Sequence, residues 1–283
     1  MLIGILEPMQ DENQQESYIY PFRKNAKGTN TSNLYAEKAD AIERHIFDSV
    51  VLPHVEQLGD KKLVVDIGAG EGRYSQYFGK DADRVIALEP DEHRCNKTRE
   101  NTQSMTAEVQ CWQTTVKDAD VADQSADVVV NIHVLQHIHP DDANAILDFA
   151  ARTVRSGGLF VFAFTKKTKK DEDWNITWEE EGRSHYVEVP EEVFRMISGA
   201  HLPTVLPVRK LHTDEVIQEV EKRGFSILST TEYAPRFLGE KKKLKGKFFM
   251  WLYRTMSAAS FHALVSRFGY PLLEDIVVVA RKQ

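Results

Sequence analysis

One short segment constrains this chain more than any other, the run VVDIGAGEGRYS at Val64–Ser75. An apolar, β-branched stretch leads into Asp66, and three glycines, Gly68, Gly70 and Gly72, follow before a helical pattern begins. Glycine adopts left-handed backbone conformations without steric cost and lets a ligand approach the main chain closely. A helix that starts there presents free N–H groups. The segment therefore predicts a strand, a tight ligand-binding turn and a helix.

Apolar runs alternate with helical patterns along most of the chain. Strands are predicted at 63–67, 84–88, 109–112, 127–132, 159–164, 226–230 and 275–280, and helices at 73–78, 92–105, 140–154 and 213–223. This alternation is typical of βαβ units, and runs such as Val128–Val130 are apolar on both faces. We expect an α/β fold: a Rossmann-like sheet of seven mostly parallel strands with helices on both faces.

Acidic residues stand at the ends of the first two predicted strands. The carboxylate of Asp66 is awkward beside a pyrophosphate but suits a ligand that carries an ammonium group. Glu89, followed by Pro90, ends the second strand about twenty residues later, where an acid can accept hydrogen bonds from both hydroxyls of a ribose. This spacing fits any cofactor of the adenosine type.

Composition excludes several classes of protein. The 36 Lys and Arg against 43 Asp and Glu give a net charge of −7, which argues against a protein dedicated to duplex nucleic acid. The two cysteines, Cys95 and Cys111, have no CxxC spacing, so neither a disulfide framework nor a cysteine zinc site is expected. The polar N-terminal stretch is unlike a signal peptide, and no run approaches the ~18 apolar residues of a membrane span. We expect a cytoplasmic protein.

The chain divides into four predicted parts. Residues 1–59 form an arm, irregular through Asn33, and one or two helices, while 60–165 form the cofactor-binding core. Residues 166–208 form an acidic insertion, with nine Asp/Glu and one Arg within 171–192, that we interpret as a lid over the substrate. Residues 209–283 complete the core and carry an extra basic and aromatic helix, with seven Lys/Arg and one Glu within 236–254.

Four motifs in order resemble the class I S-adenosylmethionine-dependent methyltransferases. Asp66–Gly72 matches the acid-x-Gly-x-Gly-x-Gly motif, and Glu89 matches the ribose-binding acid. SADVVVNIHVLQHIHP looks like the fourth strand with its following turn, and RTVRSGGLFVF like the lead into the fifth, where Gly157 and Gly158 stop a helix. The match is good over about 60–164 and looser over 209–231 and 274–282, where the last strand would run antiparallel.

The resemblance implies roles for individual residues. The cofactor would be S-adenosyl-L-methionine and the product S-adenosyl-L-homocysteine. Asp66 would hold the methionine amine, directly or through water, and Glu89 the ribose. The other residues that would border the cofactor are Gly68, Ala69, Gly70, Gly72, Pro90 and Asn131. Many members carry Gly-Asp-Ala after the third strand; here Thr115 and Val116 would contact adenine through the main chain, and Asp118 could replace the missing acid.

The acceptor side offers several candidates. His133 and His137 follow the fourth strand, and either is a candidate general base for an acceptor that arrives protonated. A structural role for His137 and a metal site at the pair stay open. Arg183 and Arg209 are candidates for a substrate carboxylate, which the sequence does not decide. The remaining candidates are aromatic residues that would either line the substrate pocket or pack against the rest of the protein: Tyr35, Trp174, Trp178 and Tyr186.

We therefore expect a methyltransferase for a small-molecule acceptor, acting as a monomer or homodimer. Segment 241–254 leaves alternatives open: single-stranded RNA, a protein acceptor, an anionic membrane surface, or plain packing. A nicotinamide-dependent oxidoreductase is disfavoured by the glycine spacing, and a non-catalytic cofactor-binding protein is a further alternative.

Overall fold

The structure is a computed structural model that describes residues 27–30, 41–167, 174–180, 183–200, 205–235, 255–257, 259–260, 263–264 and 273–283. Tyr35 and the basic segment 241–254 lie outside the described residues, so their suggested roles stay predictions. Among the described helices, none has both the length and the apolar character needed to cross a bilayer.

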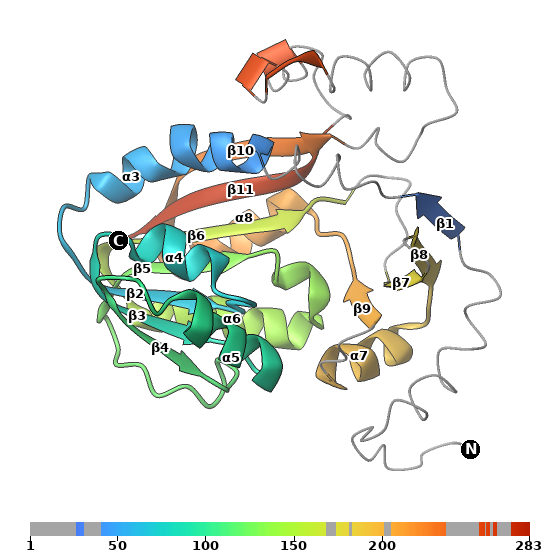
Figure 1. Cartoon of the computed structure of the whole chain (residues 1–283), viewed down its shortest axis with the longest axis horizontal. Helices are drawn as coiled ribbons and strands as arrows, with labels where there is room; N and C mark the ends of the chain where they lie inside the picture. Colours follow the sequence, from blue (N-terminus) through green and yellow to red (C-terminus); the bar gives the residue numbers. More distant parts are fainter. Residues whose placement is uncertain are drawn as a thin grey trace.

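Seven strands form the central sheet in the order β10-β11-β6-β5-β2-β3-β4 (Figure 1). They are β2 Lys61–Ile67, β3 Ala82–Leu88, β4 Glu108–Trp112, β5 Ala126–Ile132, β6 Val154–Thr165, β10 Phe225–Pro235 and β11 Leu273–Lys282. The strands from β4 to β6 pair in parallel, and β11 runs antiparallel to both of its neighbours. This confirms the predicted fold class.

The strand order places the site of the fold. β2 pairs with β3 on one side and with β5 on the other, so the chain reverses its direction of travel across the sheet between β2 and β5. In open α/β sheets, ligands bind in the crevice at the carboxyl ends of the strands at such a switch point. Asp66, Glu89 and Asn131 all lie at or next to these ends.

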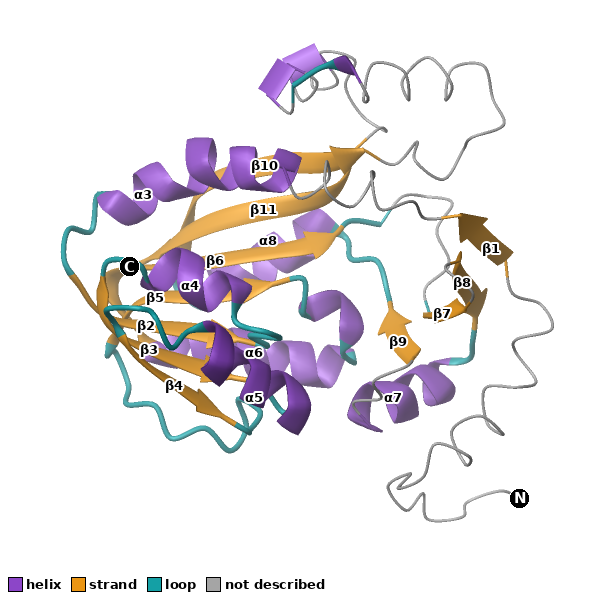
Figure 2. Cartoon of the chain, viewed as in Figure 1, coloured by secondary structure: helices purple, strands orange, loops and turns teal. Residues whose placement is uncertain are grey.

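Helices cover both faces of the sheet (Figure 2). One face packs against α4 (Arg73–Gly79), α5 (Glu92–Asn101) and the helical stretch 41–56, in which the turn η1 (Phe47–Val51) precedes α3 (Leu52–Glu56). The other face packs against α6 (Pro140–Thr153) and α8 (Thr213–Lys222). Because each central strand contributes apolar side chains to both layers, Val128–Val130 are fully buried.

A second, smaller sheet stands beside the carboxyl ends of the central strands (Figure 1). The insertion after β6 forms β7 (Asn175–Glu180), β8 (Arg183–Glu188), α7 (Glu191–Ala200) and β9 (Val205–Val208). The strand β1 (Lys27–Asn30) joins them, and the order is β1-β8-β7-β9. The irregular arm predicted through Asn33 is thus wrong at 27–30, because an edge strand needs only backbone hydrogen bonds to β8.

Several predicted element boundaries differ from the structure by a few residues, and two of the differences have a clear physical reason. Helix α5 ends at Asn101 rather than at 105, since Thr102 turns its hydroxyl back onto the carbonyl of Thr98 and the polar turn after it leaves the helix. Gly157 and Gly158 do not stop a helix: α6 already ends at Thr153 and both glycines lie in β6. An added Cβ at Gly158 would lie 2.9 Å from the Asp127 carbonyl oxygen, so close strand packing demands this glycine.

The two cysteines also differ from expectation. Cys95 of α5 and Cys111 of β4 form a disulfide, and both pack against Ala69 and Ala87 beneath the glycine-rich turn. Their separation of 16 residues hid this pairing, because it is the spacing of a helix and the strand that follows it. The cysteine spacing argued against a disulfide framework and did not predict this single bond.

Candidate functional site

The glycine-rich turn has the conformation that its sequence predicts. Gly68, Gly70 and Gly72 have φ values of +70°, +59° and +84°, in the left-handed region. An added Cβ at Gly68 would lie 2.4 Å from Cγ2 of Val134, whereas one at Gly70 would meet nothing within 4 Å. Gly68 is therefore required by close packing, and Gly70 leaves open space beside the main chain.

Glu89 ties the turn to the end of β3. Its carboxylate accepts hydrogen bonds from the N–H of Gly70 at 2.8 Å and from the N–H of Asp91 at 3.1 Å. Burial raises the pKa of Glu89, although these two N–H groups act in the opposite direction. The carboxylate is thus held in place at the rim of the crevice.

Asp66 lies deeper than expected. It is 2% exposed, and its carboxylate accepts a hydrogen bond from the hydroxyl of Ser75 at 2.6 Å. Burial, assisted by the charge of Glu89, raises the pKa of Asp66 to about 7. A ligand amine could therefore contact Asp66 directly only by reaching behind the turn; otherwise a water molecule must bridge the amine and the carboxylate.

A cavity of about 410 Å³ opens at the carboxyl ends of β2, β3 and β5. The predicted site residues that line it are Gly68, Glu89, Pro90, Thr115, Val116, His133 and His137. The predicted cofactor residues outside its lining are Asp66, Ala69, Gly70, Gly72 and Asn131. The structure thus gathers the ends of three strands around one cavity, and α7 and β9 close it from the insertion with Ile197–Gly199 and Val205–Pro207.

His137 is held in one tautomer. Its Nδ1 lies 2.7 Å from the carbonyl oxygen of Pro207 in β9, and only a protonated Nδ1 can donate to that oxygen. Burial, against the effect of this hydrogen bond, lowers the pKa of His137 to about 4. The ring is therefore neutral near pH 7, and Nε2 keeps its lone pair with no hydrogen-bond partner among the described residues.

His133 is held differently. Gln136 accepts from the backbone N–H of Thr165 through Oε1, so its amide nitrogen faces Nδ1 of His133 at 3.2 Å and donates to it. The proton of the neutral ring is then on Nε2, which lies 2.8 Å from the Tyr233 hydroxyl and 3.4 Å from the Glu43 carboxylate. Both ring nitrogens of His133 are thus engaged, in contrast to His137.

Glu43, which sequence reasoning did not single out, contacts His133 from outside the lining of the cavity. It lies in the helical stretch 41–56, is 8% exposed, and its carboxylate also contacts Arg73 at 2.8 Å and the hydroxyl of Tyr74. The hydrogen bonds from His133 and Tyr74 hold the pKa of Glu43 low although burial opposes this. No local motif marks this residue, because its partners lie 30 to 90 residues away in the sequence.

The predicted aromatic residues of the insertion lie outside the lining of the cavity. Trp174 stacks on His139 with ring centroids 5.9 Å apart, and Trp178 is 5% exposed in the apolar core of the insertion. Tyr186 is exposed. A role for these side chains in substrate binding stays a prediction.

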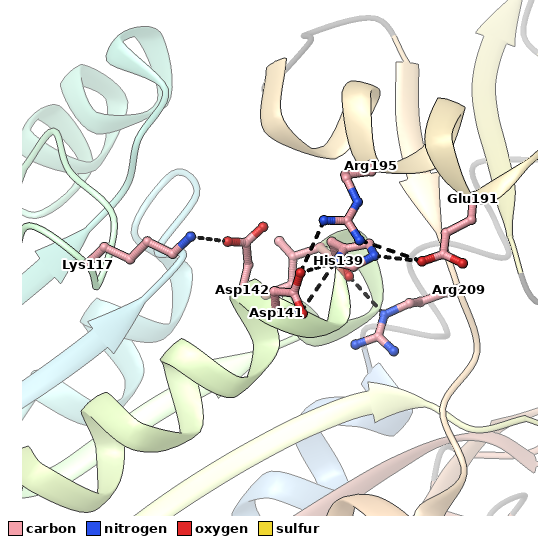
Figure 3. A network of polar contacts seen from close by, with 8 residues as sticks. Lys117, His139, Asp141, Asp142, Glu191, Arg195 and Arg209 are labelled. Atoms are coloured by element: carbon pink, nitrogen blue, oxygen red, sulfur yellow. Dashed lines mark hydrogen bonds and ion pairs between the residues drawn. The ribbon is translucent and has the colours of Figure 1, made fainter. Parts of the chain in front are cut away.

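A polar network joins the insertion to the first turn of α6 (Figure 3). Nε2 of His139 lies 3.1 Å from the carboxylate of Glu191 on α7, and Arg195 of the same helix contacts Asp141 at 3.2 Å. Arg209 donates from Nε to the carbonyl oxygen of Ile138 at 2.8 Å. Within the described part of the chain, no group of three or more His, Cys, Asp and Glu is arranged to hold a metal ion.

Known proteins share this architecture. The PH0226 protein of Pyrococcus horikoshii superposes with a TM-score of 0.51 at 12% identity, covering 89% of this chain and 93% of that one. An S-adenosylmethionine-dependent methyltransferase from Mesorhizobium loti gives 0.50 at 14% identity, covering 83% and 100%. At such identities the likeness shows the fold.

Sequence comparison adds the family. A ubiquinone biosynthesis O-methyltransferase from Rhizobium rhizogenes is 28% identical over 107 residues, which are 38% of this chain and 42% of that protein. The alignment thus spans less than half of the relative. Residues 65–162 match the family model described as a methyltransferase domain. By sequence, residues 65–162 are a methyltransferase domain. The methyltransferase domain thus holds the glycine-rich turn, Glu89 and both histidines, while β9 and α7, which close the cavity, lie outside it.

Proposed function

We propose that this protein transfers a methyl group from S-adenosylmethionine to a small-molecule acceptor, with His137 as general base. The observation that carries the proposal is the arrangement around the 410 Å³ cavity. Gly68 of the glycine-rich turn and Glu89 lie on one wall, and His137, a neutral histidine whose Nε2 has no partner among the described residues, lies on another. The cavity is small and is closed on one side by α7 and β9, which favours a small acceptor over a macromolecule.

The residues present fit the cofactor. The open space beside Gly70 accommodates a ligand against the main chain. Glu89, held by two N–H groups, would accept from the ribose hydroxyls, and Thr115 and Val116 would border the adenine. Asp66 would act on the methionine amine through water, and the main chain beside Asn131 would border the methionine. When bound, S-adenosylmethionine supplies an electrophilic methyl group on a sulfonium.

The chain's own contribution to the chemistry is alignment and proton transfer. Methyl transfer depends mainly on how the acceptor is positioned. An acceptor that arrives protonated must also lose a proton, and Nε2 of His137 is placed to take it because Nδ1 already donates to Pro207. Burial that lowers the pKa of His137 to about 4 keeps this nitrogen unprotonated at neutral pH.

The remaining expectations are part of the proposal. The net charge of −7 disfavours duplex nucleic acid as the acceptor. A cytoplasmic location and a monomeric or homodimeric state stay predictions. Acceptance of RNA, protein or lipid through segment 241–254 is the alternative that the following experiment separates from the proposal.

The experiment incubates the full chain with S-adenosylmethionine carrying a labelled methyl group and a fractionated cell extract. We expect label in the small-molecule fraction; label in RNA, protein or lipid would overturn the choice of acceptor. The Glu89→Ala variant is expected to lose S-adenosylhomocysteine binding, measured by calorimetry. If that variant bound normally, the cofactor site would be assigned wrongly.

A further inference from the structure

The insertion contributes a different kind of surface to the cavity than the methyltransferase domain does. The Asp, Glu, Lys and Arg residues of the lining all come from the domain: Glu89, Asp91, Arg94, Lys117 and Asp142. The insertion supplies only uncharged residues: Ile197, Ser198, Gly199, Val205, Leu206 and Pro207. Because the cofactor is expected against the glycine-rich turn and the end of β3, the uncharged insertion side is left for the acceptor.

Ser198 is the polar exception on the insertion side. It lies in α7, is 5% exposed, and its hydroxyl oxygen has no hydrogen-bond partner within the described part of the chain. A helical serine can bond back to the carbonyl oxygen four residues earlier, here that of Phe194, but Ser198 makes no such bond. Three buried Ser and Thr hydroxyls lack a partner among the described residues, and only Ser198 lines the cavity; the other two belong to Thr153 and Ser229.

The position of this hydroxyl favours a ligand as its missing partner. A polar group that is withdrawn from water without a hydrogen bond destabilises the unliganded protein. The serine side chain turns about a single bond, and the adjacent Gly199 also lines the cavity, where an added Cβ would meet no described atom within 4 Å. A ligand oxygen or nitrogen in the cavity can therefore pair with the hydroxyl, which both donates and accepts.

The helix that carries the hydroxyl is connected to the candidate base through one strand. Ile197 of α7 and Val205 of β9 pack in the same apolar core. Pro207 of β9 in turn accepts the hydrogen bond from His137, in η2 (Leu135–His137), at 2.7 Å. The cavity thus offers an acceptor two hydrogen-bonding groups, the Nε2 of the base and the serine hydroxyl, together with the apolar side chains of the insertion.

We propose that Ser198 hydrogen-bonds the methyl acceptor, and that this acceptor is an uncharged, largely apolar molecule with a second polar group besides the one that is methylated. A charge on the body of the acceptor would meet the apolar insertion side without a counter-ion, which disfavours binding. Ser198 would thus select acceptors by their second polar group. This inference rests on the proposed function, but it concerns acceptor choice and not the transfer itself.

The first test measures binding without turnover. The full chain saturated with S-adenosylhomocysteine is titrated by calorimetry with phenol and with the three benzenediols, which are uncharged at neutral pH and place a second hydroxyl at different distances from the first. A hydrogen bond between neutral groups predicts that at least one benzenediol binds about 3- to 10-fold more tightly than phenol. Ser198→Ala is expected to remove this gain and to leave phenol binding unchanged.

A second pair of probes tests the charge of the acceptor. 4-Hydroxybenzamide and 4-hydroxybenzoate have nearly the same shape, but only the second carries a charge at neutral pH. The amide should bind about 10-fold more tightly, because the carboxylate finds no counter-ion on the insertion side. Equal binding of the two probes, or tighter binding of 4-hydroxybenzoate, would overturn the choice of an uncharged acceptor.

Stability separates a binding role of Ser198 from a structural one. Because its hydroxyl has no partner in the free protein, Ser198→Ala should leave the free energy of unfolding unchanged or raise it. Thr177→Val removes a hydroxyl that donates to the carbonyl oxygen of His185 at 2.8 Å in the same insertion, and it should lower the free energy of unfolding. A clearly destabilised Ser198→Ala would contradict the absence of a partner and overturn the proposal.

A matched serine controls for the loss of a buried hydroxyl. Ser229→Ala removes an unpartnered hydroxyl outside the lining of the cavity and should keep the benzenediol gain. The proposal is overturned by a gain that survives in Ser198→Ala, by a gain that is lost in Ser229→Ala, or by the absence of any gain for the three benzenediols.

Failure of this inference is distinguishable from failure of the proposed function. S-adenosylhomocysteine binding and labelled methyl transfer are measured on the same preparations of the unchanged chain and of Ser198→Ala, and unchanged cofactor binding shows that the variant is folded. A chain that transfers methyl groups but shows no benzenediol gain retains the proposed function and loses only the role of Ser198.

Discussion

The two walls of the cavity are built in different ways. The wall at the ends of β2 and β3 depends on the main chain: three glycines with positive φ, and a carboxylate that binds the N–H groups of residues 2 and 19 positions away. The wall made by β9, η2 and the first turn of α6 depends on contacts between residues 52 to 71 positions apart, such as His139 with Glu191 and Arg209 with Ile138. The first wall is local in the sequence and lies within the residues that match the methyltransferase-domain model, whereas the second depends on this chain's insertion.

The largest expected effect is a difference in kcat/KM between variants of His137 and of His133. His137→Asn should lower kcat/KM about 10²- to 10⁴-fold, because the variant lacks the general base. His133→Asn should change kcat/KM much less and instead reduce the free energy of unfolding, since both ring nitrogens of His133 are already engaged. Initial rates of labelled methyl transfer decide this, and similar losses in both variants would contradict the assignment.

The walls should also respond oppositely to pH. The pKa of His137 is lowered from 6.5 to about 4, so its neutral ring contributes stability above pH 6.5 that is lost as the pH falls to about 4. The pKa of Asp66 is raised from 3.8 to about 7, so its protonated form contributes stability below pH 3.8 that is lost as the pH rises to about 7. Each shift corresponds to roughly 3–4 kcal/mol, and the two nearly cancel between about pH 4 and 6.5.

Single variants remove that cancellation. For Asp66→Asn, the free energy of unfolding should rise with pH across this window; for His137→Asn it should fall with pH. Urea denaturation of the full chain at several pH values measures both slopes. Each slope is compared with that of the unchanged chain, because Glu89 and Asp275 also have raised pKa values. An Asp66→Asn slope that is no higher, or a His137→Asn slope that is no lower, than that of the unchanged chain would contradict the assigned shift.

A smaller effect tests the glycine wall. Gly68→Ala should reduce the free energy of unfolding by about 2–3 kcal/mol, because its Cβ would strike Val134 and its φ is left-handed. Gly70→Ala should cost only about 1 kcal/mol of stability, for its φ alone, yet weaken S-adenosylhomocysteine binding. Adding Val134→Ala to Gly68→Ala should restore part of the stability; no recovery in the double variant would refute the packing argument.

The smallest expected effect concerns the contact between insertion and domain. Glu191→Gln should weaken the hydrogen bond to His139 and the pair with Arg195 by about 0.5–1 kcal/mol, since Glu191 is half exposed. Faster amide hydrogen exchange in α7, with unchanged exchange in β2 and β3, is the expected result. The neighbouring exposed residue offers a control, and Glu192→Gln should leave the exchange of α7 unaltered.

The same contrast explains what could be predicted from the sequence. All seven strands of the central sheet and four of its helices were predictable, because short β-branched apolar runs, helical periodicity and the glycine turn report on local structure. Glu89 was predictable for the same reason. The depth of Asp66 was not, because it depends on the packing of α4 and the hydroxyl of Ser75.

The insertion resisted prediction for a physical reason. The sequence makes Trp178 a candidate pocket residue. The small sheet of the insertion needs an apolar core of its own, however, and Trp178 is part of that core. The tautomer of His137 follows from its hydrogen bond to the carbonyl oxygen of Pro207, 70 residues away in the sequence. The spacing of residues along the sequence does not predict such contacts between distant segments.

The position of β11 has a consequence for how the molecule forms. Residues 273–282 lie between β10 and β6, and Ile276–Ala280 are almost completely buried there. During synthesis, β6 and β10 leave the ribosome before the strand that separates them, so the apolar edge of β6 waits for its partner while residues 166–272 are added, and β10 waits while residues 236–272 are added. This half of the sheet can therefore assemble only after residues 273–282 have been made, and a nascent chain that stops before 273 carries an open edge able to pair with its neighbours on a polysome.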